Sequence, residues 1–339
     1  MSIAFSCIEI VSFKGYLDST QSDGASFLPF FYFSLHCVTS RVMYWITTRR
    51  NRHLLEDSEY LVPPETTGAI AFVGCVYYVV ICFMTPHLQA THLVVLMQSS
   101  CVFSSVIMFL FNMVGWSWIR TCQLLLGLTS LSLIILSLFV TRHSCCIVVL
   151  IATILFLVAV VLNSYTIALT TKTLLHYPSL QSQFEFNVYK TQLPMALIVV
   201  FLFYSLRNPV RFDFVDVLTF LNVLWTGLLR TFVHTWNWLL LFAYVLSGLL
   251  YDACYSRLVL YSNPVVTSVV QVLAFFVTLA VMWAYENAHK TPAHDLLTVV
   301  SFALFSILLY WDGVTMPVFR THRGSFFENK RGEKPAESA

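Results

Sequence analysis

Long apolar stretches separated by short polar segments run along most of the chain. Each stretch approaches the roughly 20 residues that an α-helix needs to cross a bilayer. Strands of a membrane barrel would instead show short segments of alternating polarity. The pattern therefore predicts an all-α membrane protein with nine to ten transmembrane helices. The clear spans are expected at about residues 27–48, 68–85, 90–112, 119–140, 145–169, 189–206, 236–254, 264–285 and 295–313.

Two further apolar segments do not fit this pattern. Residues 3–13 contain Glu9 and are too short to span a bilayer. We expect an interfacial helix there, or the stump of a first span. Residues 217–232 contain Arg230, and we interpret them as a short helix that lies at the membrane interface or inside a loop.

Similarity between the two halves of the chain predicts an internal repeat. Gln98 and Gln271 each interrupt an apolar span and lie 173 residues apart, and the same shift places Tyr78 on Tyr251. Leu-Pro dipeptides that open two of the spans are 165 residues apart. Chance is the alternative, because apolar sequence repeats easily. Duplicated halves are common in transporters, whose substrate site lies near the midplane where the halves meet.

The repeat divides the chain into four parts. The expected parts are a first transmembrane repeat over residues 1–170 with a short or truncated first helix, a cytosolic linker over 171–188, a second transmembrane repeat over 189–313, and a disordered cytosolic tail over 314–339.

Composition and charge agree with a membrane protein. The chain is 58% hydrophobic and 11% charged, whereas soluble domains carry about 25% charged residues. With the C-terminus in the cytosol, twelve Lys and Arg residues fall on the cytosolic side and five on the other, as the positive-inside rule favours. The net charge of +2 gives no support to nucleic acid as a partner.

Polar side chains inside the spans are the candidates for function, because charge is costly within a bilayer. Arg41 could contact an anionic substrate or extend to the headgroups. Gln98 and Gln271 could hydrogen-bond each other between helices or face a wet cavity. Tyr78, among other tyrosines, could line a pore and stack on a base, or belong to an aromatic belt. No enzyme signature, metal-ligand spacing or cofactor motif is present, so neither an enzyme nor a bound cofactor or metal is expected.

Four segments carry a resemblance to a known family, and the last of them, FALFSILLYWDG, resembles its closing helix. FLPFFYFSLHCV resembles the second helix of the drug/metabolite transporter superfamily, in its triose-phosphate and nucleotide-sugar transporter branch, and QFEFNVYKTQLP is similar to the seventh helix of that branch. YSNPVVTSVVQVLAFFVTL resembles the start of the ninth helix, except that Ala274 and Phe275 stand where the branch often has Lys-Arg. The resemblance covers about residues 27–313.

The resemblance implies two inverted five-helix repeats and antiport of a nucleotide sugar or related polar organic anion by alternating access. Arg41 and Lys190 would offset the negative charge, Tyr78, Tyr189 and Tyr251 would stack on the base, and Gln98 and Gln271 would contact polar edges. The expected location is the Golgi or endoplasmic reticulum membrane. The expected partners are a small-molecule substrate, the lipid bilayer and, as an option, a second copy in a homodimer.

Two alternatives stay open. Loss of the Lys-Arg pair favours a transporter of an uncharged or drug-like metabolite. The short first helix favours a non-transporting membrane scaffold or receptor of the same fold.

Overall fold

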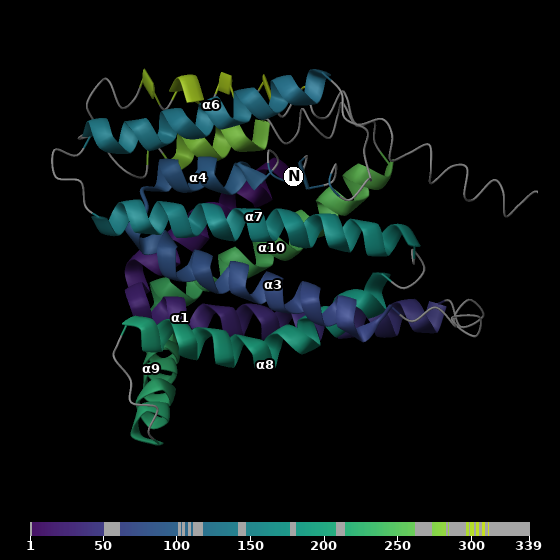
Figure 1. Ribbon diagram of the computed structural model, residues 1–339. Helices are drawn as coiled ribbons and strands as arrows, with labels where there is room; N and C mark the ends of the chain where they lie inside the picture. The colour runs from purple at the N-terminus through teal and green to yellow at the C-terminus, as the bar shows by residue number, and fades with distance from the viewer. Residues whose placement is uncertain are drawn as a thin grey trace, which may run out of the picture.

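The described part of the chain is almost entirely helical in a computed structural model, which confirms the predicted all-α class (Figure 1). The structure describes residues 2–50, 62–100, 118–141, 147–176, 181–207, 214–261 and 273–282, with isolated positions between 103 and 110 and between 284 and 311. The helices are α1 (Ser2–Arg50), α3 (Pro64–Met84), the 3₁₀ turn η1 (Thr85–His87), α4 (Ala90–Gln98), α6 (Trp118–Thr141), α7 (Ile147–His176), α8 (Gln181–Arg207), α9 (Phe214–Val233) and α10 (Thr235–Tyr261).

Helix α1 folds back on itself. A straight helix would place residues 13 and 32 about 28 Å apart. The rings of Phe13 and Tyr32 both contact Tyr244, at centroid distances of 5.1 and 6.2 Å, so they are at most about 11 Å apart (5.1 plus 6.2 Å). The helical segment Ser2–Arg50 therefore consists of two arms that run in opposite directions. We call the end of the bundle where they meet the hairpin end.

The residues that bend α1 lie around Gly24. The hydroxyls of Ser19 and Thr20 both donate to the carbonyl of Tyr16, at 2.9 and 2.6 Å. Such local side-chain bonds compete with the backbone ladder and bend helices. A Cβ at Gly24 would collide with the side chain of Thr20, so the bend needs a residue without one.

The first arm extends well beyond the predicted run of residues 3–13. Lys14 and Asp18 form a salt bridge of 2.7 Å, one helical turn apart, and Lys14 also donates to the carbonyl of Thr85 at 3.1 Å. Lys14 is buried. The ion pair lets the helix continue past two charges that end the apolar run in the sequence, because paired charges inside a low-dielectric region cost less than isolated ones. The helix in the described residues is therefore longer than the apolar run of residues 3–13.

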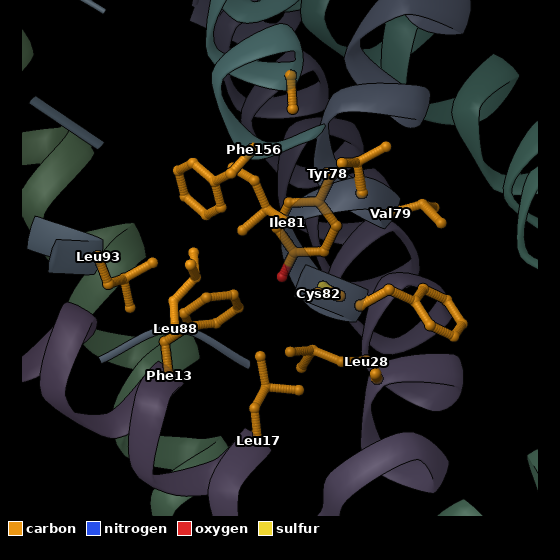
Figure 2. Close-up of a cluster of buried hydrophobic side chains, with 14 of the residues drawn as sticks. Phe13, Leu17, Leu28, Tyr78, Val79, Ile81, Cys82, Leu88, Leu93 and Phe156 are labelled. Atoms are coloured by element: carbon orange, nitrogen blue, oxygen red, sulfur yellow. The ribbon is translucent and has the colours of Figure 1, made fainter. Parts of the chain in front are cut away.

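The two arms of α1 enclose the centre of the bundle together with α3, α8 and α10. Figure 2 shows Phe13 and Leu17 of the first arm and Leu28 of the second pointing toward Cys82 of α3. These four side chains belong to one buried cluster that extends into α4, α7 and α10. Outward-facing side chains are apolar as well: Ile151, Ile154 and Val158 of α7 are exposed, as expected for a helix surrounded by lipid.

Helix boundaries follow the apolar runs and extend past them. α3 begins at Pro64, since proline is well tolerated at a first helical position, and ends just before Pro86. α7 continues to His176 and α8 begins at Gln181, so both helices extend into the expected linker. Their polar ends project beyond the apolar part.

Four described helices are long and apolar enough to cross a membrane, judged by length and composition. They are Pro64–His87, Ile147–Thr170, Gln183–Leu206 and Asp216–Val233. Shorter apolar helices within the described residues cover Leu124–Leu133, Thr235–Tyr251 and Leu273–Met282. The last of the four, in α9, runs across the direction of α3, α7 and α8 in Figure 1.

Candidate functional site

Five aromatic side chains form a continuous column in the centre of the bundle. Its members come from four helices: Tyr32 and His36 from the second arm of α1, Tyr78 from α3, Tyr189 from α8 and Tyr244 from α10. We call this group the aromatic column. Tyr78, His36 and Tyr244 are buried, whereas Tyr32 and Tyr189 are half-buried.

Some rings of the column are stacked and others are tilted: the planes of Tyr32 and Tyr78 are close to parallel, but His36 is tilted by 40° to Tyr32 and by 31° to Tyr189. Tyr32 stacks on Tyr78 at 4.2 Å with an interplanar angle of 19°. Tyr32 also contacts His36 at 4.1 Å, and His36 contacts Tyr189 at 4.9 Å. These distances are in the range of favourable aromatic pairs, which are worth about 0.5–1.5 kcal/mol beyond their buried area. The column is a set of flat surfaces held at stacking distance.

A hydrogen bond joins Tyr78 and Tyr244, and we call the end of the column that they form the inner end. The hydroxyl oxygens of Tyr78 and Tyr244 are 2.7 Å apart, and both side chains are buried. Each hydroxyl can donate or accept, so the pair satisfies two polar groups that apolar surroundings would otherwise penalise. The bond connects α3 to α10.

We call the end of the column at Tyr189 the outer end. A cationic side chain, Arg41, lies one helical turn from it. The guanidinium of Arg41 lies over the ring of Phe186 at 5.0 Å and over Tyr44 at 5.6 Å. Phe186 is three residues before Tyr189 on α8, which places the two on one face. Arg41 itself is exposed, so it can meet an anion without desolvation.

A carboxylate lies near the inner end of the column. A Cβ at Gly248 would be 3.2 Å from Oε1 of Glu9, so the carboxylate packs directly on this glycine of α10. Gly248 is one helical turn from Tyr244, and Glu9 is one turn from Phe13, whose ring contacts Tyr244. Glu9 is half-buried.

A buried amide lies on the same face of α8 as Tyr189. Gln192 is 5% exposed, and its Oε1 has no hydrogen-bond partner. A Cβ at Gly74 would lie 2.6 Å from Nε2 of Gln192, so the amide occupies the space that a side chain on α3 would need. A buried polar atom without a partner costs about 1–3 kcal/mol, which makes Gln192 a candidate for contact with a ligand.

The predicted site residues divide into three groups. Tyr78 and Tyr189 belong to the aromatic column, Arg41 lies one turn from it, and Lys190 is exposed beside Tyr189 on α8. Tyr251 is half-buried on α10, two helical turns from Tyr244. The side chains of Gln98 and Gln271 lie outside the described residues.

Sequence reasoning did not select four residues of this region: Tyr32, His36, Gln192 and Tyr244. Tyr32 sits inside the segment that carried the family resemblance, and Gln192 sits inside another, but neither was selected. Tyr244 was missed because the repeat was aligned on Tyr251. A shift of 166 residues, inside the predicted range, would have selected Tyr244 as the equivalent of Tyr78.

A second contact joins positions half a chain apart. Ser130 Oγ donates to the carbonyl of Ser301 at 2.8 Å, and Ser301 Oγ donates to the carbonyl of Ser130 at 3.1 Å. The two residues are 171 positions apart. Reciprocal contacts of this kind arise where a two-fold axis relates two surfaces.

Among the residues that the structure describes, no group of three or more His, Cys, Asp or Glu side chains could hold a metal ion.

In comparisons with known proteins, the chain matches no family model and no curated protein. The aromatic column and its polar neighbours are therefore the basis for any functional conclusion.

Proposed function

We propose that this protein is a transmembrane transporter with a substrate site at the aromatic column, and that the substrate is a nucleotide sugar or a related polar organic anion. The observation that carries this proposal is the column itself: four helices from both halves of the chain supply aromatic rings in contact with one another in the centre of a bundle. Transporters bind substrates where their halves meet, near the midplane.

The contacts between half-chain equivalents support the inverted repeats in this proposal. Tyr78 and Tyr244 bond across 166 positions, and Ser130 and Ser301 across 171, which agrees with the 165–173 offset in the sequence. Near a two-fold axis, equivalent residues contact each other. In the proposed architecture, the repeat axis would pass between α3 and α10 and beside α6.

The chemistry of the column suits a nucleobase. Stacking a nucleobase on an aromatic side chain contributes about 1–3 kcal/mol to binding, and this holds for every base. Tyr32 and Tyr189 are half-buried, so each presents part of a ring to an incoming ligand. Arg41 and Lys190 lie at the outer end, where charge-assisted bonds to phosphate are strong. Buried Gln192 would supply a polar edge contact.

The test is uptake into proteoliposomes. Radiolabelled UDP- and GDP-sugars are offered to vesicles that contain the full chain and are preloaded with the corresponding nucleoside monophosphate. We expect uptake of at least one of these sugars, reduced tenfold or more by Tyr32→Ala and by Tyr189→Ala. Tyr165→Ala, at a 39% exposed position on α7, is the matched control and should transport normally. Failure of every nucleotide sugar would refute the nucleotide-sugar assignment.

An uncharged or drug-like substrate is the second candidate. Ala274 and Phe275 are buried and apolar at the positions where the resembling family often has Lys-Arg, and Glu9 lies near the inner end of the column. Neither feature attracts phosphate. A panel of uncharged aromatic metabolites in the same vesicles separates the candidates, because this reading requires uptake that Arg41→Ala and Lys190→Ala leave unchanged.

A further inference from the structure

Helix α9 has three different faces, each a stripe of residues spaced three or four apart. The stripe Phe220, Leu224, Gly227 and Thr231 is buried or half-buried against the bundle. The next stripe around the helix is apolar and mostly exposed, at Leu218, Leu221, Trp225, Leu229 and Phe232. The third stripe is polar and mostly exposed, at Thr219, Asn222, Thr226 and Arg230. Successive residues differ by about 100° around a helix, so the three faces are roughly equal sectors.

The packed face of α9 lies against the hairpin end of the bundle. The ring of Phe220 contacts Phe201 at 5.2 Å and Tyr204 at 5.6 Å, both near the C-terminal end of α8. Near the other end of α9, Thr231 shares a hydrogen bond of 2.8 Å with the hydroxyl of Tyr16, which precedes the bend in α1. Both ends of α9 are thus attached at the same end of the bundle.

The directions of the neighbouring helices lead to the same conclusion for α8. In the second arm of α1, His36 contacts Tyr189, and Tyr44, further along, contacts Phe186, which is earlier in α8. α8 is therefore antiparallel to the second arm. That arm starts at the hairpin end, so α8 finishes there.

Similar reasoning fixes α10. In the first arm of α1, Glu9 packs on Gly248 and the later Phe13 contacts the earlier Tyr244. α10 is therefore antiparallel to the first arm, which finishes at the hairpin end, so α10 starts there. Because α8 ends and α10 begins at one end of the bundle, α9 connects them without crossing to the other.

We propose that α9 is an in-plane amphipathic helix whose apolar stripe inserts into the lipid leaflet at the hairpin end. Its length and composition match a membrane span, yet its two ends lie on one side. An in-plane helix buries an apolar face at the boundary between headgroups and acyl chains and leaves its polar face in water. The three stripes of α9 match this placement, because the packed stripe contacts the bundle, the apolar stripe faces lipid and the polar stripe faces water.

The polar stripe favours the in-plane placement of α9, in which lipid covers the apolar stripe. If α9 crossed the bilayer, Asn222 and Thr226 would lie near the middle of its length and outside the packed face. An amide such as that of Asn222 is costly to place in hydrocarbon. Arg230 is in the last turn of α9 and would reach the headgroups in either placement. In the plane of the interface, the same stripe meets water, and Trp225 lies at the depth that tryptophan favours.

Single cysteines in the full chain test this placement. The variants are Asp216→Cys and His234→Cys at the two ends, Thr226→Cys on the polar stripe and Leu221→Cys on the apolar stripe, each in sealed microsomes of uniform orientation. A membrane-impermeant maleimide should label positions 216, 226 and 234 from the same side, several-fold above the wild-type chain. Position 221 should stay at the wild-type level until detergent is added.

A second readout identifies what covers the apolar stripe. Bimane attached at position 221 in reconstituted vesicles should be quenched several-fold more by brominated phosphatidylcholine than bimane at position 226. Labelling of 216 and 234 from opposite sides would show that α9 spans the membrane and would overturn the proposal. Unquenched bimane at 221, together with disulfide crosslinking of Leu221→Cys between copies, would show a homodimer face and would overturn it equally.

Discussion

Replacing Tyr244 by phenylalanine removes one hydroxyl from the middle of the aromatic column and leaves the ring in place. The hydroxyl of Tyr78, 2.7 Å away, then loses its oxygen partner and keeps only the thiol of Cys82, a weak hydrogen-bonding group. Tyr78 is 8% exposed and Tyr244 6%, so water cannot easily replace the bond. A buried polar group left without a partner costs about 1–3 kcal/mol. We expect Tyr244→Phe, and equally Tyr78→Phe, to lower the free energy of unfolding by about 2 kcal/mol.

The double variant Tyr78→Phe/Tyr244→Phe gives the decisive result. Removing both partners leaves an apolar contact with nothing unsatisfied, which is close to neutral. The double variant should therefore be more stable than either single variant, with a coupling energy of roughly 2–4 kcal/mol, a large value for a residue pair in contact.

Unfolding by SDS titration in mixed micelles measures all four proteins on one scale. Phe72→Leu, at a 52% exposed position on α3, is the control, and surface changes of this kind stay within about 0.5 kcal/mol. If the double variant loses the sum of the two single losses, the hydroxyls act independently. The bond between α3 and α10 would then contribute nothing, and this account of the column centre would be wrong.

Three further predictions use the same assay. Gln192→Met replaces a buried amide, whose oxygen has no partner, with an apolar side chain. The free energy of unfolding should stay the same or rise by about 1 kcal/mol, while transport should fall. A loss of stability would show that the amide is structural. Gly24→Ala should cost about 1–3 kcal/mol by crowding Thr20, and Thr20→Ala in the same chain should restore part of it; no rescue would place the strain elsewhere. Lys14→Met should cost about 2 kcal/mol by leaving the one-third exposed Asp18 without its cation, and Asp18→Asn should recover most of this; an unchanged Lys14→Met would refute the ion pair.

The sequence predicts helices well wherever an apolar run is long and ends at a clear signal. Residues 68–85 were expected as a span, and α3 covers Pro64–Met84 because Pro64 and Pro86 bound an uninterrupted apolar stretch. Residues 119–140 and 145–169 agree similarly with α6 and α7. In these segments local composition alone decides the outcome.

Prediction fails where a distant contact makes a polar residue tolerable. Lys14 and Asp18 end the first apolar run in the sequence, but the carbonyl of Thr85 and the Lys14–Asp18 pair let the first arm continue. Hydropathy cannot anticipate an acceptor that lies 71 positions away. The same limit explains Tyr244, whose role depends on the hydroxyl of Tyr78 from another helix.

The column and α9 depend on the same two helices, which gives the proposed lipid contact a consequence for transport. α9 is attached to α8 through Phe201 and Tyr204 and to α1 through Tyr16. Between these attachments and the column, α1 contains Pro29 and α8 contains Pro194. Proline removes a backbone hydrogen bond and permits a kink, so each helix has a point at which its hairpin-end part can move against the part that carries His36 or Tyr189. Under the proposed transport function, a helix held at the lipid boundary would fix the hairpin-end parts of α1 and α8, and bending at Pro29 and Pro194 would open or close the column between them.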